Sequence, residues 1–315
     1  MPSATSNEVA KRLVDLREAY GAVAVGRVLT LLLVTDENHC EPAIAAANEA
    51  SHENPCRILA VVRGSSQGSG RLDAQIRVGG DAGASEVIVL RTYGPLTQHS
   101  QSVVMPLLLP DAPLVTWWPG EAPAVPAEDP VGRLGRRRIT DAAACKRPDT
   151  ALADRAESYR PGDTDLAWTR VTLWRAVLAA ALDQPPYETV TSAQVVGAAE
   201  SPSADLLAGW LALSLDCPVT RIEASGTEGV VRAQLDRVSG PVVLDRPGDE
   251  EATLTAPGRV DRHVALPRRT EAECIAEELR RLDPDEVYGE VVTTGLQRLR
   301  ENGRVTRTSS AGAAS

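Results

Sequence analysis

The sequence predicts an α/β protein with an N-terminal mixed sheet flanked by helices and a C-terminal α+β domain with an antiparallel sheet and closing helices. The length of 315 residues predicts two domains, because a domain holds roughly 150 residues. Apolar residues make up 43% of the chain, which is enough for a sizeable core. Helical and strand patterns alternate in the first half, whereas short strands follow one another in the second half.

The first half supplies the elements of the mixed sheet. Ser6 can cap a helix whose apolar positions recur at helical spacing as far as Tyr20. The run from Asn38 to Glu41 supplies a cap and an acidic residue for a second helix. That second helix is expected at 41–53, and a third at 97–109 is kinked or ended by Pro106. The strands expected here are at 27–34, 56–62, 72–78, 86–91 and 113–118.

Two loose stretches follow, and they set the predicted domain boundary. Residues 119–130 are rich in Pro and Ala, and residues 146–162 are charged. We place the boundary in the second stretch, which gives an N-terminal α/β domain at 1–160 and a C-terminal α+β domain at 161–302. The Ser, Ala and Gly content of 303–315 predicts a disordered tail.

The second half begins with a strong helix at 164–182, which acidic residues open and Asp183–Pro186 ends. A capping box at Thr270–Glu273 opens one closing helix, and the run Asp283–Glu286 opens the other. Between these lie a helix at 201–215 and an antiparallel meander with strands near 217–223, 229–236, 240–245, 251–255 and 260–266.

Charge and composition exclude several classes of partner. The net charge of −10 repels phosphate backbones and anionic lipids, so we expect no nucleic acid and no membrane partner. The apolar run at 28–34 is far shorter than the roughly 20 residues of a membrane span, and no signal peptide is visible. Five scattered cysteines without a CxxC pair fit reduced thiols, which predicts a soluble cytoplasmic protein.

No motif assembles an active site. The glycine-rich run Arg63–Arg71 has neither the P-loop spacing nor the dinucleotide-binding spacing, so a strand connection is favoured. His39, Cys40, His52 and Cys56 lack the paired spacing of structural zinc ligands. Acidic pairs stand where helices begin, and capping explains them. We therefore predict no catalytic residue, no cofactor and no metal.

The tryptophans give more information about function than the motifs above, because each large aromatic side chain must be buried or contact a partner. Trp117 and Trp118 are consecutive on a predicted strand, so their side chains point to opposite faces of the sheet. A sheet that is covered on both sides would bury both of them. Otherwise one of them is exposed beside Pro119 and becomes a candidate anchor for a partner.

The helix at 164–182 carries two more tryptophans. Arg170 and Trp174 lie four residues apart, so the guanidinium can stack on the indole. Trp168 lies about 120° from Trp174 around the helix axis, which predicts different neighbours for the two rings. Packing inside the domain and contact with a partner are both open interpretations.

Several of these strings also carry a resemblance to a known family. They are Met105–Gly120, Arg136–Asp141, Tyr159–Arg170 with Trp174 and Arg175, and Leu282–Tyr288. In this order, from about residue 28 to 290, the sequence resembles the OpcA family, the glucose-6-phosphate dehydrogenase assembly proteins. One departure is Asn54, which stands where the family pattern has His before Pro-Cys-Arg.

The resemblance implies a protein without catalytic activity that binds glucose-6-phosphate dehydrogenase and favours its active oligomer in the oxidative pentose phosphate pathway. The contact residues are predicted separately, from the enrichment of aromatic residues and Arg in interfaces. These predicted partner-binding residues are Trp117, Trp118, Trp168, Arg170, Trp174 and Arg175.

Two alternatives compete with the assembly role, and the protein's own oligomeric state stays open. The chain could bind a sugar phosphate through Arg136–Arg138 and the loop Gly64–Arg71, because Arg forms bidentate contacts with phosphate. It could also be a thiol redox sensor that acts through Cys56 or Cys145.

Overall fold

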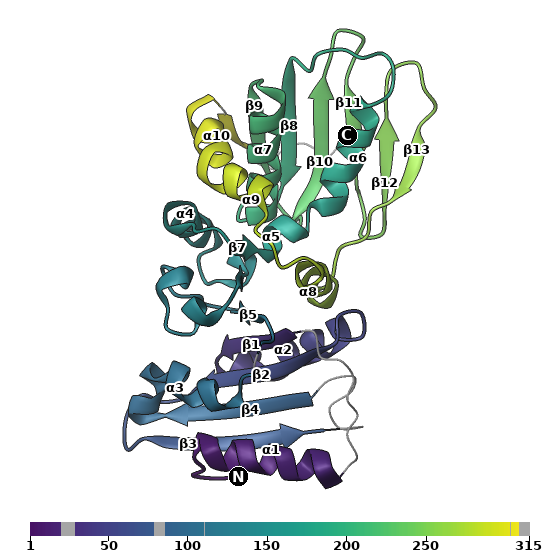
Figure 1. The fold of residues 1–315 in the computed structure, drawn as a ribbon. Helices are drawn as coiled ribbons and strands as arrows, with labels where there is room; N and C mark the ends of the chain where they lie inside the picture. Colours follow the sequence, from purple (N-terminus) through teal and green to yellow (C-terminus); the bar gives the residue numbers. More distant parts are fainter. Residues whose placement is uncertain (20–28, 79–85, 110, 303, 309–315) are drawn as a thin grey trace. The chain divides into compact units, whose positions relative to one another are not determined.

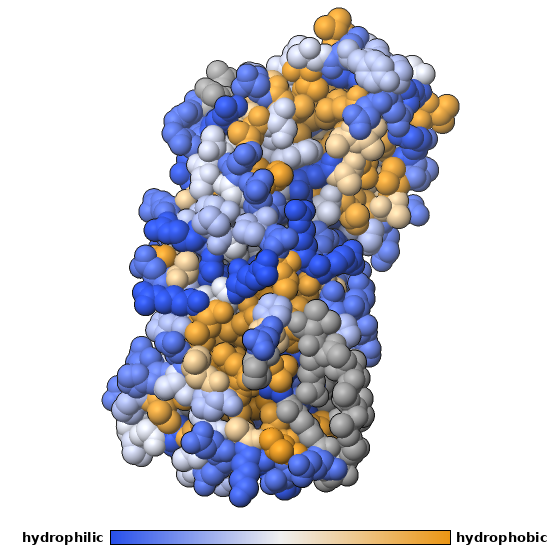
Figure 2. Space-filling view, in the orientation of Figure 1, coloured by the Kyte–Doolittle hydropathy of each residue, from blue (hydrophilic) through white to orange (hydrophobic). Residues whose placement is uncertain are grey.

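A computed structural model describes residues 1–19, 29–78, 86–109, 111–302 and 304–308 (Figure 1). The chain forms two compact units. Unit 1 combines 1–144, 160–164 and 270–284, and unit 2 combines 145–159, 165–269 and 285–315. In the described part of the chain, no helix is both long and apolar enough to cross a bilayer. Charged and polar areas (blue) alternate with apolar areas (orange) over the face drawn in Figure 2.

Unit 1 is built on a mixed sheet, as predicted. The described strands run in the order β3-β4-β2-β1-β5-β6-β7, in which β4, β2, β1, β5 and β6 are parallel neighbours and β3 is antiparallel to β4. The strands are β1 (Leu29–Thr35), β2 (Cys56–Arg63), β3 (Arg71–Arg77), β4 (Glu86–Tyr93), β5 (Leu114–Trp117), β6 (Arg137–Thr140) and β7 (Asp163–Asp165).

Helices cover both faces of this sheet. The described helices are α1 (Ser6–Ala19), α2 (Glu37–Ala50), α3 (Ser100–Val104) and α8 (Glu271–Arg280), with short 3-10 turns η2 (Gly94–Gln98) and η3 (Met105–Leu107) beside α3. Asp36 caps α2, not Asn38 as predicted, because its carboxylate accepts from the backbone N–H groups of Asn38 and His39. Helix 97–109 is divided into α3 and η3, and Pro106 stands at the start of η3.

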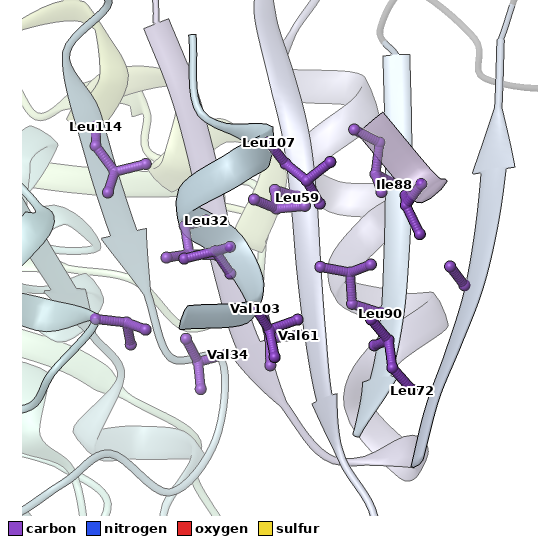
Figure 3. Close-up of a cluster of buried hydrophobic side chains, with 14 of the residues drawn as sticks. Leu32, Val34, Leu59, Val61, Leu72, Ile88, Leu90, Val103, Leu107 and Leu114 are labelled. Carbon is purple, nitrogen blue, oxygen red and sulfur yellow. The ribbon is translucent and has the colours of Figure 1, made fainter. Parts of the chain in front are cut away.

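The core of unit 1 follows from strand alternation. Leu32 and Val34 point to one face, where residues from β2 and β4 join them beneath α1, α3 and η3 (Figure 3). Leu31 and Leu33 point to the other face and are fully buried. Central parallel strands are buried on both faces and therefore have continuous apolar sequences, as in Leu29–Thr35.

Unit 2 contains the second sheet, whose described strands run in the order β13-β12-β11-β10-β8-β9-β14. The meander of β10 to β13 is antiparallel as predicted, whereas β8 and β9 are parallel, and so are β9 and β14. The strands are β8 (Ser192–Gly197), β9 (Val219–Ala224), β10 (Val230–Asp236), β11 (Val242–Asp245), β12 (Glu251–Thr255), β13 (Arg262–Ala265) and β14 (Arg304–Thr308).

The elements of unit 2 depart from the predictions at three places. The helix expected at 164–182 is divided into β7, α5 (Leu166–Thr169) and α6 (Thr172–Leu182). Helix α4 (Pro148–Ser158) occupies the stretch predicted to be loose. Part of the predicted tail forms β14, while 303 and 309–315 lie outside the described residues. The remaining helices are α7 (Pro202–Leu215), α9 (Glu286–Glu290), a π-helical turn η7 (Val291–Gly295) and α10 (Leu296–Asn302).

Helix α8 shows how the two units share the chain. The sequence places it in the C-terminal domain, but its contacts assign it to unit 1, where it packs on α2. The predicted capping box is present, because Thr270 and Glu273 bond reciprocally. The side chain of Asn54 fixes the helix at its side by donating to the carbonyl of Ala276 at 2.9 Å.

Candidate protein-docking site

The consecutive tryptophans at the end of β5 lie inside unit 1. Trp117 and Trp118 are 0% and 1% exposed. Trp118 belongs to the cluster around Leu32, and a Cβ on Gly132 would lie 3.1 Å from its ring. Trp117 is paired with Leu33 and so occupies the opposite face. Of the two interpretations, the structure shows the one in which a doubly covered sheet buries both rings.

The tryptophans of unit 2 contact different neighbours, as predicted. The guanidinium of Arg175 lies 3.4 Å from the ring centre of Trp168, whose Nε1 donates to Asp285 at 2.9 Å. The guanidinium of Arg246 lies 5.2 Å from the ring centre of Trp174. The predicted stacking of Arg170 on Trp174 is replaced by these two pairs, because the helix is interrupted at Arg170, between α5 and α6.

The six predicted partner-binding residues therefore have unequal access to a partner. Trp168 and Trp174 are 1% and 2% exposed, so their rings are interior, like those of Trp117 and Trp118. Arg170, between α5 and α6, and Arg175, on α6, are half-buried. Trp168 also packs against Tyr288 of α9, with ring centres 6.0 Å apart, which ties α5 to the C-terminal helices of the unit.

The arginine run 136–138 is paired with carboxylates inside unit 1. Arg137 donates from Nε to Glu278 at 2.9 Å, and both side chains are 5% exposed. Arg138 pairs with Asp163, and Arg136 pairs with Asp283 at 2.8 Å on the surface. These pairs weigh against the phosphate-binding alternative, since a phosphate would have to displace a buried carboxylate.

The other features of the alternatives differ in exposure, because Gly64–Arg71 is exposed, Cys145 is partly buried and Cys56 is buried. In the glycine-rich loop, the Arg71 guanidinium lies 4.2 Å from the Tyr93 ring centre. All five cysteines are unbridged, and Cys56 is 2% exposed. Burial raises the pKa of the Cys40 thiol to about 11. Within the described ranges, no group of three or more His, Cys, Asp and Glu side chains is placed to hold a metal ion.

A surface groove on unit 2 lies between α6 and the edge of the second sheet. Its volume is about 440 Å³, within the roughly 300–1,000 Å³ of ligand sites. Figure 2 shows apolar surface where α6, β12 and β13 lie in Figure 1. Its apolar lining comes from both walls and comprises Val177, Ala180, Ala181, Leu254, Val264 and Ala265.

The helical wall of this groove follows from the sequence of α6. Trp174, Leu178 and Ala181 recur at helical spacing and are buried, so this side of α6 faces the sheet. Ala180 is exposed. Small side chains on the flank of the helix leave space that larger residues would fill. The helix ends at Leu182, before Pro185 and Pro186.

The strand wall is the hairpin of β12 and β13, which forms the end of the sheet. The turn between the strands carries Arg259, whose guanidinium binds Gln184 and the carbonyl of Pro185 just after α6. Arg237 donates to the carbonyl of Pro186 at 3.2 Å. Arg259 therefore ties the hairpin to the segment after α6, and Arg237, which follows β10, ties the same segment to the sheet.

Alternate residues of β13 direct their backbone N–H and C=O groups away from the sheet. Leu266 donates to the carbonyl of Glu250, and bonds of an antiparallel ladder recur at every second residue. Val264 and Arg262 consequently face β12, while the N–H and C=O groups of His263 and Ala265 point away from the sheet. In the described residues, no backbone bond is present on this side of β13.

Positive charge borders the groove although the chain as a whole is acidic. Arg262 shares the face of Leu254 and Val264, and no Asp or Glu of the described residues lines the groove or the small pocket at its end. Arg237 lines that pocket, is 8% exposed, and has an Nε without a hydrogen-bond partner in the described part of the chain. Asp183 and Asp261 are not part of either lining.

Comparison with known proteins gives two family matches that follow one another along the chain. The family model for the N-terminal domain of a glucose-6-phosphate dehydrogenase subunit matches residues 47–157. The family model for the C-terminal domain of the same kind of protein matches residues 161–292. No curated protein matches the sequence.

The solved structures that match are distant. A glucose-6-phosphate dehydrogenase in complex with glucose 6-phosphate has 9% identity and a TM-score of 0.38, with 89% of this chain and 94% of that chain covered. An oxidoreductase from Sinorhizobium meliloti has 9% identity and a TM-score of 0.41, with 87% of each chain covered. These TM-scores are too low to support any inference about this chain.

Proposed function

Since the chain belongs to the OpcA family of glucose-6-phosphate dehydrogenase assembly proteins, we propose that it binds this dehydrogenase and favours its active oligomer without catalysing a reaction itself. The observation that carries the proposal is the pair of consecutive domain matches, which together run from residue 47 to 292. The role places the protein at the head of the oxidative pentose phosphate pathway. Its unbridged cysteines are consistent with a reducing cytoplasm.

The physical mechanism is linkage between binding and assembly. A protein that binds the active oligomer more tightly than the inactive form shifts the population by its differential affinity. No chemical step by the assembly protein is needed. The effect should therefore saturate as the assembly protein is added in excess, and it should reverse on dilution.

The buried position of the tryptophans limits how they take part. We propose that Trp117, Trp118, Trp168 and Trp174 act indirectly, by fixing the shapes of the two units. Arg170 and Arg175 are half-buried and so retain access to a partner. The proposal is consistent with the stacking of Arg175 on Trp168, which holds that arginine in one orientation.

The direct test is to mix the purified protein with its cognate dehydrogenase and to follow NADP reduction. We expect higher dehydrogenase activity and a complex that co-elutes in size-exclusion chromatography. The matched control is the same protein after heat denaturation. Absence of a complex at micromolar concentration, together with unchanged activity, would refute the assembly role.

A further inference from the structure

We propose that the groove between α6 and β13 binds an extended acidic segment of the dehydrogenase, which joins the second sheet as an additional strand beside β13. The identity of the partner rests on the proposed function. The binding mode rests on the groove itself.

The first argument is the open strand edge. His263 and Ala265 present N–H and C=O groups away from the sheet, and exposed groups of this kind pair readily with another strand. Strand β13 is short, and its side chains are mostly exposed. An extended segment gains specific main-chain bonds along such an edge.

The second argument is the position of the groove relative to that edge. Side chains of an added strand alternate between the two faces of the sheet. Those on the face of Val264 would enter the groove between β13 and α6, where Val177 and Ala180 complete an apolar lining. The edge and the groove therefore select the same ligand, an extended chain with apolar side chains at every second position.

The third argument is charge. Arg262 lies in the groove, and Arg237 and Arg259 line the pocket at its end. Arg262 is exposed, so a carboxylate on the added segment can reach its guanidinium from solvent. The chain carries a net charge of −10, and a basic groove on an acidic protein favours an acidic segment by complementarity.

The test compares variants of the full-length protein for affinity toward the cognate dehydrogenase by isothermal titration calorimetry. His263→Pro removes an outward N–H and leaves the ladder to β12 intact, whereas His263→Ala retains that N–H. We expect the proline variant to bind about tenfold more weakly and the alanine variant to bind within about twofold of the parent.

A second pair keeps the test valid if proline disturbs the hairpin. Ala180→Glu places a carboxylate in the groove, while Ala179→Glu changes an exposed neighbour on α6 outside the lining. Only the first should weaken binding. If His263→Pro and Ala180→Glu both bind like the parent, and the parent binds and activates the enzyme, the proposed strand addition is wrong and the assembly role stands. If the parent protein neither binds nor activates, both fail.

Discussion

At the scale of single residues, the arginines at 136–138 have a structural role, and the buried ion pair of Arg137 and Glu278 is the main example. An arginine run in an acidic protein looks like a binding site for an anion. Inside unit 1 it instead receives carboxylates from segments far along the chain. Arg137 also donates to the backbone carbonyl of Asp283 at 2.6 Å. The arginine run therefore holds the segment 270–284 in unit 1.

Replacing Glu278 should show the energetic importance of this pair. Glu278→Ala leaves Arg137 buried without its carboxylate, and we expect a loss of about 3–5 kcal/mol in the free energy of unfolding, measured with urea. Asp283→Ala removes only the exposed partner of Arg136 and should cost at most about 1 kcal/mol. Equal losses in the two variants would contradict the assignment of the buried pair.

Cysteine reactivity gives a second residue-scale prediction. Burial raises the pKa of Cys40 to about 11, so its thiol remains protonated at neutral pH and does not attack an alkylating agent. We expect iodoacetamide at pH 7.5 to modify the partly exposed Cys217 before the buried Cys40, as followed by mass spectrometry. The pKa of Cys217 is also raised, first by burial and then by Asp216, so its labelling should accelerate toward higher pH.

Labelling in urea is the control for this experiment, because all five thiols should then react at similar rates. Rapid modification of Cys40 in the folded protein would show that α2 opens under native conditions.

At the scale of elements, two glycines set the contact between α7 and the π-helical turn η7. A Cβ on Gly295 would lie 2.7 Å from the carbonyl oxygen of Gly209, and a Cβ on Gly209 would lie 3.2 Å from the backbone of Gly295. The two backbones therefore meet with no side chain between them. This contact joins the central helix of unit 2 to the segment that precedes α10.

Gly295→Ala should separate these helices. We expect a loss of about 1–3 kcal/mol in the free energy of unfolding, because the added methyl group meets backbone that cannot yield. Gly248→Ala is the matched control, since a Cβ there meets nothing within 4 Å. If both variants unfold at the same denaturant concentration, the close approach of α7 and η7 is not tight in solution.

The elements were predictable where local signals are strong. The capping box at Thr270 gave a helix start that the structure confirms, and the helix predicted at 201–215 is present as α7. The break at Arg170 was not predictable, because the residues around it have good helical patterns. The interruption comes with a cap at Asp165, whose side chain accepts from the N–H of Ala167, and with β7 at the edge of the first sheet.

At the scale of the whole molecule, the sequence predicted a mixed first sheet and an antiparallel meander in the second. It did not predict the parallel pairs of β9 with β8 and β14, or how the chain is shared between the units. Arg137 and Glu278 are 141 residues apart, and no local pattern reveals such a pairing. The docking groove was missed for the same reason. Its walls, Ala180 and Val264, meet only because β13 ends the sheet beside α6. The one local signal of the groove in the sequence was the alanine-rich flank of α6.

Truncation tests the shared architecture. A fragment of residues 1–165 retains β7 but lacks α8, so it exposes the face of α2 and leaves Arg137 without Glu278. We expect this fragment to unfold without a cooperative transition in circular dichroism. A synthetic peptide of residues 268–285 should restore cooperativity when it is added. Cooperative unfolding of the fragment alone would show that unit 1 does not require α8.

The route of the chain has a consequence for biosynthesis. Because residues 270–284 complete unit 1, its first 144 residues cannot finish folding until about 140 more are made, roughly 7–28 s at 5–20 residues per second. Throughout that interval the nascent polypeptide carries an unfinished apolar surface over α2. A nonsense codon before residue 270 would therefore release a product that lacks α8 and can complete neither unit.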